Sequence, residues 1–312
     1  VADGLSSNRV RAIVQDKHNL IWFGSDEGLD CYYGTHIKSF KFFADDTPNL
    51  AVMALLPTDT TLWIGTEDGL FTFNYATEQI CPFVISTSAG VSINTTVAHI
   101  AAEADGAVWI ATMGQGLFRF DAHTHTLQQY SKTGQNDYKV NVTIDAHGDV
   151  WTLSNWSTND GIYKFNRISN RFEKFNIMLS NNEPYDAMGL ALLPDDDDNK
   201  LWIGTFRDGL LCFDIQTGIV TQQCVPSEQN KLTHIHSLLQ YAPHQILIGS
   251  DDGLAIYNTQ TQNFTLFTHD DAQPYSISGR FIYPLVRDNE GGVWIGTFYN
   301  GVNYISPRSG TF

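Results

Sequence analysis

Hydrophobic and polar residues alternate along this chain in stretches of only a few residues, and clusters of Gly, Asn, Asp and Ser separate the stretches. Period-two alternation over short segments bounded by turn residues is typical of β-strands. The first series predicts an inner strand over Val10–Gln15, a second strand over Leu20–Ser25, a third over Leu29–Tyr33 and an outer strand over Ile37–Phe43. The pattern therefore predicts four-stranded antiparallel sheets joined by tight turns.

One sequence signature recurs seven times, and its spacing predicts the architecture. The clearest copies are Leu201–Phe213, Thr61–Phe73 and Gly292–Ile305, and the others are centred on Trp22, Trp109, Trp151 and Leu247. Successive anchor residues lie 41 to 51 positions apart, as from 22 to 63 and from 151 to 202. This period suits a four-stranded propeller blade. We expect residues 1–312 to form a single all-β domain, a seven-bladed β-propeller of four-stranded antiparallel blades.

Two glycines accompany most of the anchors. The anchor side chain is expected to pack between neighbouring blades, and a glycine two residues later, such as Gly24, allows a close approach. A second glycine, such as Gly28, supplies the positive φ angle that the next turn requires. Ala111 and Leu153 replace the first glycine, so the third and fourth blades are expected to pack differently.

The composition fits a single all-β domain and excludes some classes of partner. The chain has 312 residues, of which 42% are hydrophobic and 12% aromatic, enough for a continuous core. Its net charge is −16 with only 18 basic residues, which argues against nucleic acid as a partner because phosphate neutralisation needs a basic face. No apolar run approaches the length of a membrane span, so we expect no membrane contact by this domain.

Cysteine, histidine and aspartate clusters give no persuasive metal site. The acidic run Asp195–Asn199 lacks the ligand spacing of a calcium loop, and it is predicted to be a solvated turn. The pairs His123 with His125 and His234 with His236 have no evident third ligand. We expect no metal and no cofactor. All four cysteines are predicted to be buried thiols in strands: Cys31, Cys81, Cys212 and Cys224.

The last repeat is incomplete. Phe312 aligns with Phe172 and Phe264, so the chain stops where the outer strand of the seventh blade should begin. The last blade is therefore expected to lack its outer strand here. Because an unpaired sheet edge is a liability, we expect the natural polypeptide to continue past one or both ends.

The runs Leu5–Gly34 and Pro274–Ile305 resemble the two-component regulator propeller repeats of hybrid two-component sensors from gut Bacteroidetes. The resemblance implies a periplasmic sensor region with two seven-bladed propellers and an immunoglobulin-like domain. A membrane helix and cytoplasmic histidine kinase, receiver and DNA-binding modules would follow. It also implies a glycan-derived oligosaccharide as the ligand, the second propeller as a partner and a homodimeric full-length sensor.

A ligand is expected at the end of the blades where the second-to-third-strand turns and the interblade loops lie, because these segments vary most. Aromatic rings suit the faces of pyranose rings, and Asn and Arg suit hydroxyls or carboxylates. Trp156 and Tyr299 are predicted as stacking surfaces, although Trp156 could instead pack on a neighbouring loop or domain. The other predicted contacts are Phe206, Arg207, Arg280, Asn300, Tyr138 and Tyr185.

Catalysis has little support, and we expect this chain not to be an enzyme. Asp16, Asp145 and Asp288 precede their tryptophans by six residues, whereas the aspartate box of sialidases has five. No His/Glu constellation like that of streptogramin lyase can be assembled, and paired carboxylates are too common here to be informative. Two alternatives stay open: a propeller lyase or hydrolase, and a structural propeller that positions other domains without binding ligand.

Overall fold

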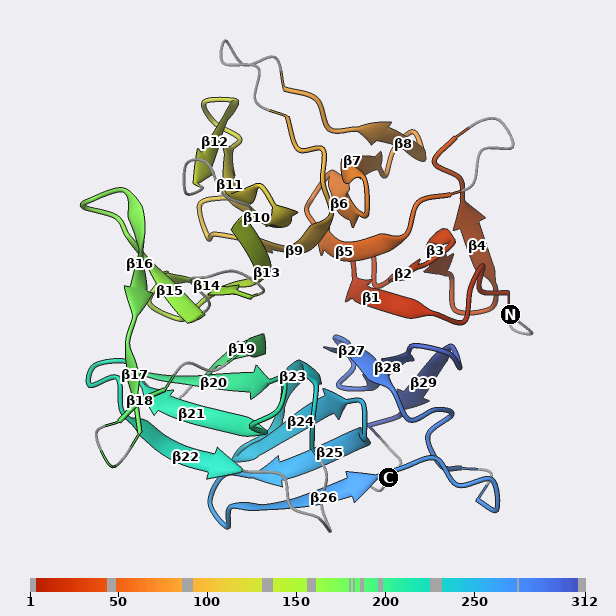
Figure 1. The fold of residues 1–312 in the computed structure, drawn as a ribbon. Coiled ribbons are helices and arrows are strands. Elements are labelled where there is room, and N and C mark those ends of the chain that lie inside the picture. The colour runs from red at the N-terminus through yellow and green to blue at the C-terminus, as the bar shows by residue number, and fades with distance from the viewer. Residues whose placement is uncertain are drawn as a thin grey trace. The chain divides into compact units, whose positions relative to one another are not determined.

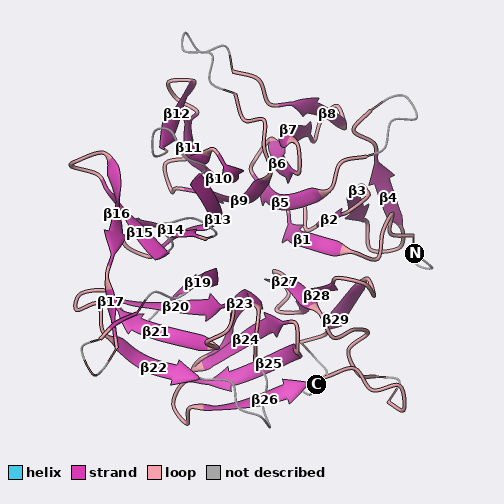
Figure 2. Ribbon diagram, viewed as in Figure 1, coloured by secondary structure: helices cyan, strands magenta, loops and turns pink. Residues whose placement is uncertain are grey.

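The computed structural model describes residues 4–43, 49–85, 92–130, 137–155, 161–179, 181, 183–185, 188–195, 199–224, 232–273 and 275–307. They divide into two compact units. Unit 1 comprises Val1–Phe83 and His236–Phe312, and unit 2 comprises Val84–Ile235. The regular structure described in both units is antiparallel β-sheet, as the alternating pattern predicted (Figure 2).

Within each sheet of unit 1, consecutive strands pair with one another (Figure 1). Its first two sheets are β1 (Val10–Gln15), β2 (Ile21–Ser25), β3 (Gly28–Tyr32) and β4 (Ile37–Phe40), then β5 (Val52–Pro57), β6 (Thr61–Thr66), β7 (Gly69–Asn74) and β8 (Gln79–Pro82). A third sheet has β23 (Ile235–Ala242), β24 (Gln245–Ser250), β25 (Gly253–Asn258) and β26 (Asn263–Phe267). The last has β27 (Ile282–Arg287), β28 (Val293–Thr297) and β29 (Val302–Ile305).

Unit 2 follows the same up-and-down order with two additions. Its strands are β9 (Val97–Ala102), β10 (Val108–Gly114), β11 (Gly116–Asp121), β12 (Thr126–Tyr130), β13 (Asp137–Ile144), β14 (Val150–Ser154), β15 (Gly161–Asn166), β16 (Arg171–Phe175), β17 (Ile177–Met178), β18 (Pro184–Tyr185), β19 (Gly189–Pro194), β20 (Lys200–Thr205), β21 (Leu210–Asp214) and β22 (Val220–Cys224). β10 runs through Met113 and Gly114 and pairs with β13, so β9 to β16 form one eight-stranded sheet. β17 and β18 form a small separate sheet where only a loop was expected.

The predicted strands agree closely with the observed ones in the first sheet. β1 covers the predicted inner strand in full, and β4 ends at Phe40 instead of Phe43. In the last sheet the described residues form three strands, in agreement with the predicted missing outer strand. The number of blades stays a prediction.

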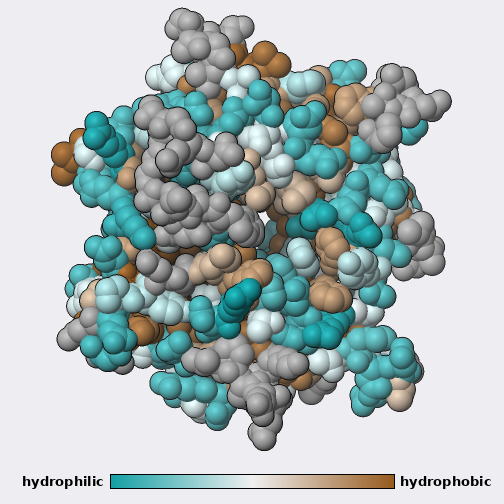
Figure 3. Space-filling view, in the orientation of Figure 1, coloured by the Kyte–Doolittle hydropathy of each residue, from teal (hydrophilic) through white to brown (hydrophobic). Residues whose placement is uncertain are grey.

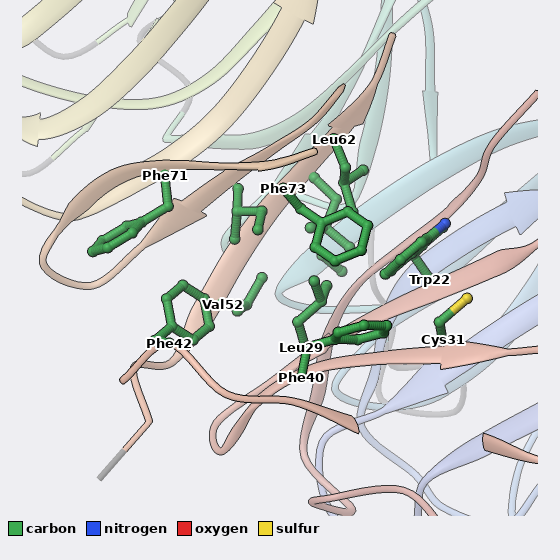
Figure 4. Close-up of a cluster of buried hydrophobic side chains, with 12 residues drawn as sticks. Trp22, Leu29, Cys31, Phe40, Phe42, Val52, Leu62, Phe71 and Phe73 are labelled. Atoms are coloured by element: carbon green, nitrogen blue, oxygen red, sulfur yellow. The ribbon is translucent and has the colours of Figure 1, made fainter. Parts of the chain in front are cut away.

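The anchor residues pack between neighbouring sheets, as predicted. Trp22 of β2 lies against Phe40 of its own sheet and Phe73 of β7, with ring centroids 5.5 and 4.9 Å apart (Figure 4). Trp109 and Trp151 are equally buried within unit 2. Since truncating a buried aromatic costs about 3 to 5 kcal/mol, these contacts are a main source of stability.

The glycine two residues after an anchor, as at Gly24 and Gly204, receives a side chain from the next inner strand. A Cβ atom at Gly24 would lie 2.4 Å from a methyl group of Val52, and one at Gly204 would lie equally close to Ile235. Leu153 reverses the pair, because its side chain lies against Gly189 of the next inner strand. The fourth repeat therefore packs differently, as expected, through an exchange of the large and the small residue.

An acid latch, defined as an Asp or Glu carboxylate that accepts the anchor indole N–H, closes the turn before most anchors. Asp145 is 9% exposed; one of its oxygens accepts the amides of His147 and Asp149, and the other accepts Trp151 Nε1 at 2.8 Å. Asp16 and Asp288 make the same three contacts with residues two, four and six positions later. Glu103 and Asp195 hold Trp109 and Trp202. Asp195 is thus latched to an indole, not simply solvated as predicted.

The cysteines correct one prediction. Cys31 and Cys212 are buried, but Cys81 is exposed and Cys224 is partly exposed, because both lie on outer strands. All four are free thiols, and Cys224 lies opposite Leu210, two positions from Cys212. Burial raises the pKa of the Cys212 thiol to about 11, so it stays protonated at neutral pH.

The surface agrees with a strongly acidic chain. On the face shown in Figure 3, hydrophilic residues predominate among those coloured, and hydrophobic residues occur in small groups. Scattered apolar residues of this kind are normal on a folded protein and need no partner to cover them. A binding site is therefore better sought in the arrangement of particular side chains.

Candidate ligand-binding site

Aromatic and arginine side chains gather in unit 1 at the end of the sheets where the inner strands begin. Arg9 and Arg11 flank the start of β1, His236 and Tyr283 lie near the starts of β23 and β27, and Phe298 and Tyr299 form the β28–β29 turn. In an antiparallel sheet, the start of the first strand and the turn between the second and third lie at the same end. We call these six residues the aromatic–arginine cluster.

Its aromatic rings form a continuous stack. His236 stacks on Tyr283 with centroids 4.0 Å apart, and Tyr283 stacks on Phe298 at 4.9 Å. Tyr299 meets Phe298 edge-on at 4.8 Å and is 50% exposed. The stack is thus supported from within unit 1 and ends in an aromatic ring that solvent can reach.

Two guanidinium groups lie over the end of this stack. Arg9 is 5.4 Å from the Tyr299 ring, and Arg11 is 4.9 Å from that of Phe298, both distances suited to cation–π attraction. Asp26, in the β2–β3 turn, pairs with both arginines. Burial alone would raise the pKa of Asp26, but the hydrogen bonds and charges of Arg11 and Arg9 outweigh it and lower that pKa. The carboxylate therefore stays ionised and orients both arginines.

Arg280 adds a third arginine next to the cluster, over the Phe281 ring that contacts Tyr299. Its Nη2 donates to Asp252 at 2.9 Å, and its Nε donates to the Asp251 carbonyl at 2.9 Å. Asp251 also pairs with His236 Nε2 at 2.7 Å. Three carboxylates thus balance three arginines here, although the whole chain carries −16. The predicted contact Arg280 keeps 58% of its side chain exposed.

The β28–β29 turn that presents Tyr299 is held at both ends. Thr297 Oγ1 accepts the Asn300 amide at 2.8 Å and donates to the Gly301 carbonyl at 2.9 Å. Gly301 has a φ of 73°, which favours glycine, and its amide donates to the Asn8 carbonyl. Asn300 is exposed beside Tyr299. The turn is therefore a fixed platform for the ring, and a rigid platform suits ligand recognition.

The other predicted residues lie in unit 2 and do not form one group. Phe206 contacts the His234 ring at 4.0 Å, and the exposed Arg207 lies over Phe206 at 5.4 Å. Tyr138 lies in β13 between Asp137 and Lys139, a buried ion pair. Tyr185 packs on an apolar cluster, where burial and the neighbouring Asp208 raise its pKa. Trp156 lies outside the described residues.

Sequence reasoning missed most of the aromatic–arginine cluster. Arg11, His236 and Tyr283 occupy one repeat position, the residue after the first inner-strand residue, next to Val10, Ile235 and Ile282. Other copies have aliphatic residues there, such as Met53 and Leu190. Aligning the repeats on the inner strand instead of the tryptophan anchor would have exposed this signal.

Comparison with known proteins supports the expected fold. The family model "Two component regulator propeller" matches residues 4–27, which overlap the first of the two runs that carried the resemblance. Histidine kinase P4 of Formosa agariphila is 23% identical over 281 residues, which cover 86% of this chain and 20% of the kinase. The chain therefore spans about a fifth of the length of this relative. The repeat resemblance is confirmed for the matched residues.

Solved structures show the same architecture. The extracellular domain of a hybrid two-component system from B. thetaiotaomicron matches with a TM-score of 0.80 and 23% identity, covering 98% of this chain and 41% of that one. Virginiamycin B lyase from Staphylococcus aureus matches with a TM-score of 0.71 and 13% identity, covering 96% of this chain and 95% of the enzyme. At these identities the likeness establishes the fold, an all-β propeller, and not the function.

Two searches of the described residues complete the site survey. No group of three or more His, Cys, Asp or Glu side chains in this part of the chain is arranged to hold a metal ion. The same residues contain no helix with the length and apolarity that a membrane crossing requires.

Proposed function

We propose that this chain is a ligand-sensing propeller of a hybrid two-component regulator, and that it recognises a glycan-derived oligosaccharide in the periplasm. The repeat match at residues 4–27 and the likeness to an extracellular sensor domain support the regulatory assignment. The chain itself is not catalytic in this proposal. Histidine kinase activity would belong to another part of a longer protein, as the shared segment with a histidine kinase suggests.

The observation that carries the proposal is the aromatic–arginine cluster. Tyr299 offers an exposed ring that can stack on a pyranose. The Arg9 guanidinium lies over that ring, and the Arg280 guanidinium lies over Phe281, which contacts Tyr299. Carboxylates already orient these guanidinium groups, so little side-chain freedom would be lost on binding. A neutral or acidic sugar fits this set of groups.

Signal transmission would require partners outside the chain. A second propeller beside this one and a homodimer of the complete sensor are the partners that the resemblance implies, and both belong to the proposal. Binding would then change how the sensor domains pack, and that change would be relayed to the kinase. Neither nucleic acid nor a membrane is a proposed partner of this domain.

The proposal is tested by calorimetry against a panel of oligosaccharides, using this chain and the complete sensor region. Tyr299→Ala should weaken binding at least tenfold, whereas Tyr299→Phe should keep the stacking part of the affinity. Arg9→Ala should also weaken binding. Its matched control is Arg171→Ala, because Arg171 is an exposed arginine on the outer strand β16. Turnover of a panel sugar by the pure protein would instead support the lyase or hydrolase alternative. Equal affinity in all variants would exclude the cluster as the site.

A further inference from the structure

Two arginines of the aromatic–arginine cluster share a single carboxylate. Arg9 Nη1 donates to Asp26 Oδ2 at 3.2 Å, and Arg11 Nε donates to Asp26 Oδ1. Both guanidinium groups also lie close to one ring, 5.5 and 4.9 Å from the Phe298 centroid. Glu27, the next residue of the turn, is exposed and pairs with neither arginine. This point of the cluster therefore has two positive charges and one paired negative charge.

The other two acids beside the cluster have partners of their own. Asp252 pairs with Arg280 at 2.9 Å. Asp251 pairs with His236, whose ring lies at the opposite end of the aromatic stack from Arg11. The charges thus balance over the whole region, but the balance is uneven, and the excess of positive charge lies at the end of the stack where the exposed ring is.

Both arginines keep hydrogen-bond donors for a ligand. A guanidinium group has five N–H donors. Arg9 and Arg11 each direct only one nitrogen at Asp26, and no other acceptor for their guanidinium groups lies among the residues that the structure describes. The Arg9 side chain is 51% exposed, whereas that of Asp26 is 19% exposed. A ligand can therefore reach the donors of Arg9 more easily than the carboxylate.

An acceptor with a negative charge suits these donors better than a neutral hydroxyl. Hydrogen bonds between a guanidinium and an anion are roughly twice as strong as bonds between neutral groups, and the planar fork fits a carboxylate or a sulfate. The net charge of −16 does not prevent such binding, because exposed charges are screened over about 8 Å at physiological salt. One anionic group would match the two positive charges of Arg9 and Arg11 with two negative ones.

We propose that the ligand of this site is an anionic sugar, whose carboxylate or sulfate ester binds to Arg9 and Arg11 together while its ring contacts Tyr299. This inference rests on the proposed function and narrows the ligand to a sugar with a negative group. Arg9 joins the two parts of the site, because its guanidinium lies 5.5 Å from the Phe298 centroid and 5.4 Å from that of Tyr299. In a uronic acid the carboxylate is bonded directly to a ring carbon, so one residue of the sugar can make both contacts.

Calorimetry with matched pairs of sugars tests the proposal in the complete sensor region. The pairs are trigalacturonic acid with its neutral methyl ester, and lactose 3′-sulfate with lactose. In a pair that binds, the acidic member should bind at least about tenfold more tightly than the neutral one. This preference should shrink between about 50 and 500 mM NaCl, because salt screens exposed charges. The pair with the larger preference distinguishes a carboxylate ligand from a sulfate ligand.

Variants of the two arginines assign the preference to this site. Arg9→Gln/Arg11→Gln should remove the preference for the acidic member and leave the weaker binding of the neutral one. Arg9→Lys/Arg11→Lys keeps the charges without the fork and should keep part of the preference. Arg171→Gln replaces an exposed arginine of β16 and should keep all of it. Thermal melting shows whether each variant is folded, and Arg9→Gln alone replaces the double variant if that one is not.

Three results would count against the proposal, and they differ in what else they exclude. If the neutral members bind as tightly as the acids and Tyr299→Ala weakens both, the sugar-sensing function stands and the preference for an anion is wrong. If the preference for the acid survives in folded Arg9→Gln/Arg11→Gln, the negative group binds elsewhere. If neither pair binds at all, nor any other acidic or neutral oligosaccharide, the proposed function fails and this inference fails with it.

Discussion

The two ends of the sheets use the same strands for different purposes. At one end, the turn between the first and second strands carries the acid latch, and Asp16, Asp145 and Asp288 repeat the same three hydrogen bonds. At the other end of unit 1, the aromatic–arginine cluster is built from positions whose residues differ between most repeats. Repetition marks the end that stabilises each sheet, and variation marks the end available for recognition.

Not every anchor is preceded by the latch, because the residue six positions before Trp63 is Pro57. The sheet with Leu247 as anchor has Tyr241, not an acid, six residues earlier. A leucine offers no N–H, so a buried carboxylate there would lack one of its three donors. Where the acid is present, its contacts are to the turn amides and the indole.

The largest effect is expected at the anchor itself. Trp202 is 1% exposed, and Trp202→Ala should lower the free energy of unfolding by about 3 to 5 kcal/mol, as should Trp63→Ala. Urea denaturation followed by fluorescence measures this. An unchanged denaturation midpoint in both variants would contradict burial of the anchors between sheets.

A smaller loss is expected from the latch. Asp145→Ala leaves two amides and the Trp151 indole without their acceptor and should cost about 2 to 3 kcal/mol. Asp59→Ala removes the same charge from a side chain that is 94% exposed, and it should cost less than about 0.5 kcal/mol. In a double-mutant cycle, Trp151→Phe and Asp145→Ala should cost less together than the sum of the two. Additivity would mean that the indole contact contributes nothing.

The dependence of stability on pH tests the burial of His99 in unit 2. Burial lowers the pKa of His99 from its ordinary value of 6.5 to about 4, partly offset by its hydrogen bond to the Val142 backbone. In the unfolded chain His99 therefore binds a proton below about pH 6.5, whereas in the folded chain it binds one only below about pH 4. Stability should fall by about 1 to 2 kcal/mol between pH 7 and pH 5 because of this residue. Urea titrations of His99→Gln should lack this part of the decline, and identical pH profiles would refute it.

The smallest effect on stability is expected from the predicted contacts in unit 2. Arg207→Ala and Trp156→Ala should change the free energy of unfolding by no more than about 0.5 kcal/mol but weaken binding of the cognate sugar. Calorimetry and thermal melting of the same samples separate the two effects. If both variants bind like wild type, unit 2 contributes nothing through these side chains, and the site is confined to unit 1 or lies elsewhere in the sensor.

The repeats made the fold predictable, whereas the site was only partly so. Seven copies of a strand–turn–strand pattern predicted the antiparallel sheets and the burial of Trp22, Trp109 and Trp151, because alternation and turn chemistry are local properties. The pairing of β10 with β13 and the small β17–β18 sheet were not predicted. No local sequence pattern indicates that β10 continues through Met113 and Gly114 to reach β13. Cys81 was misplaced because outer strands bury only part of one face.

The cluster escaped prediction because its members are far apart in sequence. Tyr299, Asn300 and Arg280 were predicted from their turns and loops, but Arg9 and Arg11 were not. These arginines lie beside Phe298 only because β1 packs next to β27 and β28. Contacts between the first and last sheets of unit 1 are long-range, and the pattern along a single repeat carries no information about them.

The central proposal is that one end of the sheets stabilises the fold and that the other end recognises a ligand. The most direct test compares Arg9→Ala/Tyr299→Ala with Asp145→Ala in the complete sensor region, measuring sugar affinity by calorimetry and the melting temperature on the same samples. We predict that the first variant loses at least tenfold in affinity and melts like wild type, while Asp145→Ala melts lower and, where folded, binds like wild type. The opposite result, unchanged affinity in the first variant and lost affinity in folded Asp145→Ala, would contradict the account.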